Sequence, residues 1–133
     1  MERSAWEGVL EVLKRWVKRL KFRCTALACP MVNTPFWIDA DVVIIGLFKQ
    51  VTPWLLSRYG YPEGFLPYCG VYEDSRGFIH LIPQKYRKVA PPPIHLFIHL
   101  ITRKEFLRWC WHPCYRKIAL EGVCLRDDLK LLT

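Results

Sequence analysis

With 133 residues and a hydrophobic fraction of 52%, the chain is expected to form one domain with a packed core. Its formal net charge of +8 favours an anionic partner, such as nucleic acid or an acidic protein surface. We expect no secretory signal and no membrane span, because the longest apolar run, residues 42–48, is far below the about 20 residues that cross a bilayer. The six cysteines therefore suggest core residues, metal ligands or reactive thiols before a disulfide framework.

The first predicted element is an amphipathic helix. Ser4 and Glu7 have the spacing of a capping box, in which each side chain binds a backbone N–H of the first turn. Apolar residues then recur at helical spacing, from Trp6 to Leu20. The opposite side becomes cationic toward its end, where the candidate nucleic-acid contacts are Lys14, Arg15, Lys18 and Arg19. The same residues also suit the negative pole of the helix dipole, so both explanations stay open.

The next stretch is predicted to be a loop followed by a buried strand. Pro30 and Pro35 indicate a loop after Cys24 and Cys29. Residues 36–48 indicate a strand whose second half is apolar on both faces, as at the centre of a sheet. A short helix over residues 54–59 should follow, started by Thr52-Pro53 and closed by Gly60.

A hairpin is the clearest prediction in the middle of the chain. Residues 71–73 and 78–82 flank Asp74-Ser-Arg-Gly77, which suits a type I turn. The stretch after it cannot continue a central strand, because Pro91-Pro-Pro93 lacks three backbone donors. We expect an exposed cationic loop there, with further candidate nucleic-acid contacts at Lys85, Tyr86, Arg87 and Lys88.

The last forty residues hold an apolar segment and two predicted helices. Periodicity does not decide whether residues 94–101 form a strand or a helix. Thr102 and Glu105 form a second capping box, which predicts a helix to about Trp111, and Pro113 opens another that ends at Gly122.

These elements predict an α+β fold. A long N-terminal amphipathic helix would pack on a small, mainly antiparallel sheet, followed by a C-terminal helical segment organised around zinc. The chain would be a single domain over residues 1–133. Within it, residues 1–93 would be the helix-plus-sheet half and residues 94–133 the cysteine and histidine segment.

A cysteine and histidine cluster is the sharpest local feature. Thiolate and imidazole are ligands that zinc prefers, and four of them in a tetrahedron close a structural site. The candidate ligands for Zn²⁺ are Cys110, His112 and Cys114, completed by His99 or Cys124. The alternative is a set of buried thiols near a partly exposed histidine.

Enzyme motifs are missing from the sequence. There is no GxxxxGK[ST], GxGxxG or GxSxG pattern, whose geometry would hold phosphates or build a nucleophile elbow. Asp39 and Asp41 have oxygen ligands suited to magnesium, but a structural role beside a strand is the simpler interpretation. We therefore expect a binding protein and no enzyme.

The segment Ala119-Leu-Glu-Gly-Val-Cys124-Leu125 resembles an elongin-binding box, in which a leucine and a small cysteine share one amphipathic helix. Asp128 departs from the box, which has an aliphatic residue at that position. Such a helix could equally belong to the core, and Gly122 in its interior would cost about 1 kcal/mol against alanine.

The order of a basic, tryptophan-rich N-terminal half, a cysteine and histidine cluster and this box resembles lentiviral virion infectivity factor (Vif). Residues 15–22, the hairpin near Gly77 and Ile98-His99-Leu100 are similar in character. The resemblance implies a viral adaptor that holds a host antiviral factor, typically an APOBEC-class cytidine deaminase, against a cullin-RING ubiquitin ligase. It also implies a structural zinc and a place in the cytoplasm or nucleus of an infected host cell.

In that reading the elongin B and C contact uses Leu120, Cys124 and Leu125. Trp16 and Trp54 are candidate anchors for the partner proteins, because large aromatic side chains supply much of the energy of interfaces. The alternative function is a zinc-stabilised, basic RNA-binding protein, in which cations neutralise phosphates and rings stack on bases.

Overall fold

The computed structural model describes residues 5–33, 38–49, 52–60, 62, 69–73, 79–83, 94–109 and 111–131. The helices are α1 (Ala5–Lys18), α2 (Thr52–Tyr59), α3 (Arg103–Trp109) and α4 (Pro113–Glu121). The strands are β1 (Cys24–Asn33), β2 (Ile38–Gly46), β3 (Cys69–Glu73), β4 (Ile79–Pro83), β5 (Ile94–Thr102) and β6 (Val123–Asp127). They form one sheet in the order β3-β4-β5-β2-β1-β6. The α+β prediction is confirmed, and every strand pair is antiparallel except β2 with β5.

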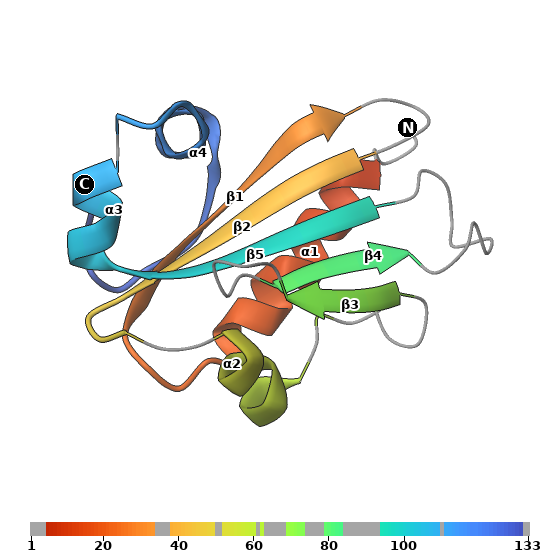
Figure 1. Ribbon diagram of the computed structural model, residues 1–133, viewed down its shortest axis with the longest axis horizontal. Coiled ribbons are helices and arrows are strands. Elements are labelled where there is room, and N and C mark those ends of the chain that lie inside the picture. The colour runs from red at the N-terminus through yellow and green to blue at the C-terminus, as the bar shows by residue number, and fades with distance from the viewer. Residues whose placement is uncertain are drawn as a thin grey trace.

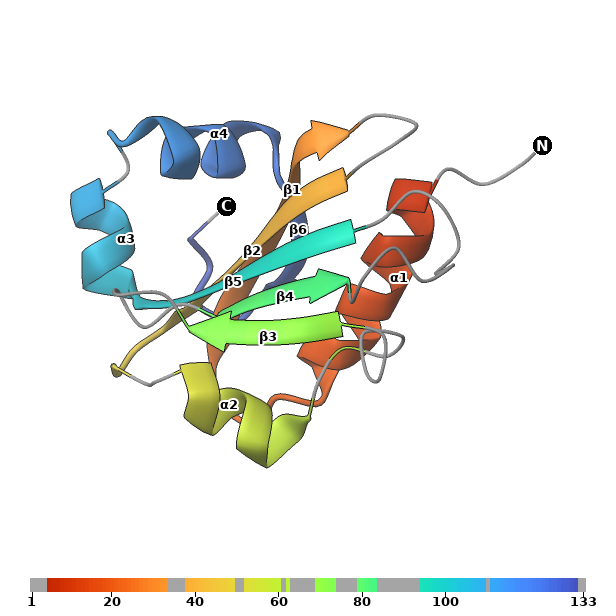
Figure 2. The ribbon, with the colours of Figure 1, turned by 45° about the vertical axis from the view of Figure 1, so that its right-hand side comes forward.

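Helices cover both faces of the sheet (Figures 1 and 2). On one face α1 and Leu55 of α2 pack against alternate residues of β1, β2 and β5. On the other, Phe106 of α3 and Tyr115 and Ile118 of α4 pack against the residues between them. This division follows from the two-residue period of a strand, which sends successive side chains to opposite faces.

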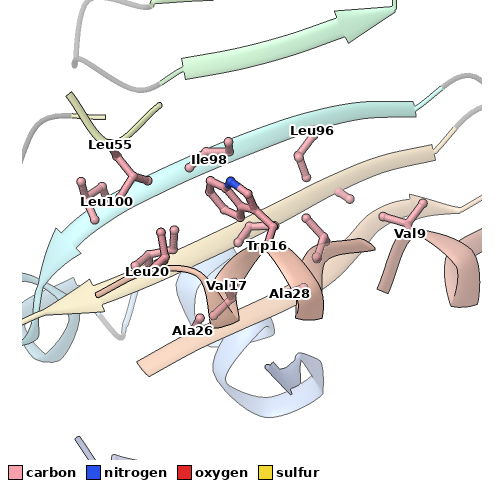
Figure 3. Close-up of a cluster of buried hydrophobic side chains, with 14 of the residues drawn as sticks. Val9, Trp16, Val17, Leu20, Ala26, Ala28, Leu55, Leu96, Ile98 and Leu100 are labelled. Carbon is pink, nitrogen blue, oxygen red and sulfur yellow. The ribbon is translucent and has the colours of Figure 1, made fainter. Parts of the chain in front are cut away.

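The N-terminal helix packs through the apolar side that its periodicity predicts. Leu13, Trp16 and Val17 are buried, and Figure 3 shows Trp16 lying among Leu96, Ile98 and other side chains of the sheet. The indole Nε1–H of Trp16 also donates to the carbonyl oxygen of Gly60 at 2.9 Å. Ser4, the proposed cap, lies outside the described residues.

The loop predicted between Pro30 and Pro35 is wrong for residues 30–33, which belong to β1, and residues 34 and 35 lie outside the described residues. Pro30 misled the prediction because proline lacks an N–H, yet it is tolerated where a strand has one free edge. The neighbouring β6 pairs only with residues 25–28 of β1, so Pro30 lies beyond it. The pairing of β1 with β2 also shifts register between Pro30 and Val32, as at a bulge.

The predicted central strand is confirmed as β2, which lies between β5 and β1. Its residues 40–46 are buried. The undecided segment after the triple proline is the strand β5, which pairs with β2 in parallel, so that Asp41 faces Phe97 and Val43 faces His99 in register. The predicted hairpin is confirmed as the antiparallel pair β3 and β4, although its turn lies outside the described residues.

Two predicted helix-end signals are confirmed, the glycine that ends α2 and the capping box that starts α3. Helix α2 ends at Tyr59, and Gly60 follows with φ +75°, a left-handed conformation that favours glycine. In the capping box of α3, the Thr102 N–H donates to Glu105 Oε1 at 3.1 Å and the Glu105 N–H donates to Thr102 Oγ1 at 3.0 Å.

The C-terminal segment differs from the single amphipathic helix of the predicted elongin box. Helix α4 ends at Glu121, and Gly122 leaves it with φ −68° and ψ 154° while its N–H donates to the Ile118 carbonyl. Residues 123–127 then form β6 at the edge of the sheet. Leu120 is therefore on a helix and Cys124 on a strand, because pairing with β1 satisfies the backbone of residues 123–127 better than a glycine-interrupted helix would.

Candidate functional site

A cavity of about 630 Å³ lies between the sheet and the α3–α4 segment. Its floor is formed by Met31 of β1, Asp39 and Asp41 of β2, and Phe97 and His99 of β5. Its remaining lining comes from the segment after β2, from α3, and from α4 and the residues before it, namely Lys49, Glu105, Trp109, Trp111, His112, Cys114 and Tyr115. Eight of these side chains are titratable, namely Asp39, Asp41, Lys49, His99, Glu105, His112, Cys114 and Tyr115.

Three buried polar side chains from three elements meet in this cavity. His99 Nε2 lies 3.1 Å from Asp41 Oδ2, and His99 Nδ1 lies 3.1 Å from Tyr115 Oη. Asp41 is 8% exposed, His99 3% and Tyr115 7%. We call Asp41, His99 and Tyr115 the buried triad.

The hydrogen-bond roles within the buried triad follow from the chemistry of its groups. A carboxylate only accepts hydrogen bonds, so Asp41 selects the tautomer in which His99 carries its hydrogen on Nε2. The Nδ1 of His99 is then an acceptor, and the hydroxyl of Tyr115 donates to it. The arrangement is an acid, an imidazole and a hydroxyl in series.

The ring of Tyr115 is held by other aromatic side chains. Its centroid lies 5.5 Å from that of His99, 5.9 Å from that of Trp109 and 6.5 Å from that of Phe106. The backbone around it is also fixed, because His112 caps α4 by accepting from the Cys114 N–H and Pro113 occupies the first turn. The hydroxyl of Tyr115 therefore has a defined position in the cavity.

At one side of the cavity, Lys49 and Glu105 form an ion pair of 3.1 Å. Burial by itself would raise the pKa of Glu105, but hydrogen bonds from the Thr102 backbone and from Lys49 hold it below its usual value. The pair links the segment that follows β2 to the first turn of α3.

The structure separates the predicted zinc ligands into different environments. His99, His112 and Cys114 all line the cavity, but His99 has Asp41 and Tyr115 at its two ring nitrogens, and Cys124 lies on β6. Cys110 lies outside the described residues. Within the described ranges, no three His, Cys, Asp or Glu side chains gather closely enough to hold a metal ion. His112 and Cys114 by themselves are two of the four ligands that a structural zinc needs.

The predicted partner-binding residues differ in their exposure to solvent. Trp16 is wrong as a surface anchor, because it is fully buried on the helix face that packs on the sheet. Trp54 is half-exposed on α2 with its ring edge-on to Tyr59. Leu120 is 74% exposed and Cys124 is exposed, while Leu125 packs against the α1 side of the core.

Four predicted nucleic-acid contacts lie on the outer side of the first helix or directly after it. Lys14, Arg15, Lys18 and Arg19 are all exposed. The second group, Lys85, Tyr86, Arg87 and Lys88, lies outside the described residues.

Sequence reasoning missed the buried triad. The sequence suggests separate roles for Asp41, as half of a carboxylate pair, and for His99, as a fourth zinc ligand, and it suggests no role for Tyr115. The available signal was polar residues two or four positions apart within two otherwise apolar strands, Asp39 and Asp41 on β2 and His95 and His99 on β5. The pairing of β2 with β5 is what joins them.

Comparison with protein-family models, with curated proteins and with solved structures gives no match. In the part of the chain that the structure describes, no helix is long and apolar enough to span a membrane.

Proposed function

We propose that the protein is an adaptor that binds other proteins through its α3–α4 segment. The observation that carries the proposal is the exposure of large apolar side chains on this segment, where Trp111 is 71% and Leu120 74% exposed and Leu107 is more than half exposed. Large apolar and aromatic side chains that are held out from a packed element are typical anchors of protein interfaces.

The anchoring of α4 supports this role. Tyr115 and Ile118 are buried against the sheet, so the helix is fixed while Leu120 points away from the core. Five basic and two acidic residues lie between positions 103 and 121, which favours a partner surface that is apolar with an acidic rim.

By the resemblance to the Vif family, the partner of Leu120 is elongin C, and the adaptor presents an antiviral deaminase to a cullin ligase. Leu120 is the principal contact in this proposal, because its side chain is free to enter an apolar groove. Cys124 is an auxiliary contact on the edge strand β6, at the same end of α4.

Co-purification with elongins B and C tests the proposal. We expect Leu120→Asp to abolish recovery of both elongins, whereas Phe48→Asp, which places the same charge on an exposed apolar side chain outside the α3–α4 segment, leaves it unchanged. Circular dichroism of both variants controls for folding. Absence of elongins from the wild-type complex would rule out this partner, and equal loss in both variants would show that Leu120 is not the contact.

RNA binding is a second candidate, favoured by the four exposed cations on and after the outer side of α1. Replacement of two of them in Lys14→Ala/Lys18→Ala should weaken binding to single-stranded RNA and reduce the salt dependence of that binding. The control is Lys104→Ala/Arg108→Ala on α3, which removes the same charge elsewhere. Equal effects of the two double variants would indicate attraction by net charge alone.

A structural zinc belongs to the same proposal. Zinc would be bound by His112 and Cys114 at the start of α4 and by further ligands, of which Cys110 is the nearest in sequence. Metal analysis of protein purified without chelator should find one zinc per chain, absent from Cys110→Ser/Cys114→Ser. Protein that is folded and free of metal would exclude the site.

A further inference from the structure

The buried triad has the connectivity of a site that activates a hydroxyl group. In such sites an imidazole withdraws the proton of a hydroxyl, while a carboxylate on the other ring nitrogen orients the ring and stabilises the charge that develops on it. Here the carboxylate is Asp41, the imidazole His99 and the hydroxyl that of Tyr115, with 3.1 Å at each contact.

A purely structural role accounts less well for this arrangement. Asp41 and His99 lie on β2 and β5, two interior strands of the sheet, where neighbouring positions on the same face are Val43, Ile45 and Ile101. Burying polar groups there costs free energy that apolar residues would avoid. The buried triad also borders an open cavity of about 630 Å³, in which a ligand has room to meet Tyr115 Oη.

We propose that Asp41, His99 and Tyr115 form a nucleophilic site, in which Tyr115 Oη accepts an acyl group from an uncharged ester bound in the cavity. Carboxylates from Asp39, Asp41 and Glu105 in the lining disfavour an anionic substrate, and Lys49 is paired with Glu105. The indole rings of Trp109 and Trp111 line the same cavity and suit a flat or apolar substituent.

The reaction balances without a cofactor. Tyr115 Oη forms a bond to the ester carbonyl carbon as its proton passes to His99 Nδ1. The bond from that carbon to the alkoxy oxygen then breaks, and the proton on His99 passes to the departing alcohol. The products are acyl-Tyr115 and the alcohol, and water activated by His99 can release the acid in a second step. Asp41 accepts from His99 Nε2–H throughout.

The test uses p-nitrophenyl acetate with the full chain at neutral pH, with acetylated residues assigned by peptide mass spectrometry. Residue assignment separates Tyr115 from Cys114 and from surface lysines, which also react with this ester. We expect Tyr115 to be acetylated at least about 100-fold faster than Tyr59, a partly buried tyrosine of the opposite core cluster. Wild-type protein alone decides this comparison, so it does not depend on the folding of any variant.

Two variants test the roles of the other members. Asp41→Asn keeps the size of the side chain but not its charge, and His99→Gln removes the base. Each should slow acetylation of Tyr115 by about 100-fold and leave that of Tyr59 unchanged. The proposal is overturned if Tyr115 in the wild type reacts no faster than Tyr59. It is also overturned if folded Asp41→Asn and His99→Gln both keep the wild-type rate. Elongin recovery does not enter either readout, so the adaptor proposal and this one fail separately.

Discussion

Arg126 on β6 and Asp128 just beyond it form an ion pair in which Nη2 and Nε of the arginine lie 2.7 and 2.8 Å from the same oxygen, Oδ2. The pair holds the guanidinium where Nη1 donates to the carbonyls of Val17 and Leu20 and Nη2 to that of Phe22. One side chain of the last strand therefore donates to three carbonyls in the last turn of α1 and just after it, of which that of Val17 also accepts from the Leu20 N–H.

Replacement of this arginine should destabilise the fold. We expect Arg126→Met to lower the free energy of unfolding by about 2 kcal/mol or more, because three carbonyls lose a charged donor. The measurement is chemical denaturation at neutral pH. Arg116→Met, an exposed arginine on α4, should change it by less than about 0.5 kcal/mol. Equal effects would show that the carbonyl contacts contribute little.

The same ion pair predicts a loss of stability in acid. The hydrogen bond from Arg126 holds the pKa of Asp128 below its usual value, although burial acts in the opposite direction. Since the folded pKa is lower than the unfolded one, about 3.9, the contribution is complete above that value and is lost as pH falls through the folded pKa. Asp128→Asn should therefore lose less stability than the wild type between about pH 5 and pH 2. A parallel pH dependence of the two proteins would contradict this.

Two glycines should respond oppositely to alanine. At Gly122 the φ angle is ordinary, but an added Cβ would overlap the carbonyl oxygen of Ile118. We expect Gly122→Ala to cost about 1–3 kcal/mol. At Gly8, inside α1, an added Cβ meets no atom within 4 Å, so Gly8→Ala should stabilise by about 1 kcal/mol. Thermal or urea unfolding of both variants gives the sign of each change in stability. A stabilising Gly122→Ala would indicate that the helical conformation of α4 extends past Glu121.

The hydrogen bond between Trp16 and Gly60 is testable apart from the burial of the indole ring. Trp16→Phe removes the donor and keeps an aromatic ring, so it should cost about 1–3 kcal/mol through the unpaired Gly60 carbonyl and a smaller ring. Trp54→Phe on the half-exposed position of α2 should stay within about 0.5 kcal/mol. Similar values for both would mean that the bond to Gly60 adds nothing.

Local signals were enough to predict several elements. The apolar side of α1, the capping box at Thr102 and Glu105, and the proline and glycine that bound α4 all act within one or two helical turns. The central position of β2 was also predictable, because a strand that is apolar on both faces has to be covered on both. In each case the residues that decide the structure are near one another in the chain.

Tertiary structure decided the rest. In the sequence Pro30 favours a loop, but pairing with β2 makes it part of a strand. Residues 123–125 suit a helix in the sequence, but pairing with the edge of β1 makes them part of β6. The helical spacing of the apolar residues predicts that Trp16 lies on the apolar side of α1. That side is buried only because it packs on the sheet.

The candidate site shows the same division most sharply. Sequence alone determined that Asp41 and His99 are polar residues within apolar segments. The parallel pairing of β2 with β5, and the packing of α4 on them, determined that both meet Tyr115. The alternation of side chains along a strand is a local property of the backbone, whereas the choice of neighbouring strand depends on contacts between residues 58 positions apart.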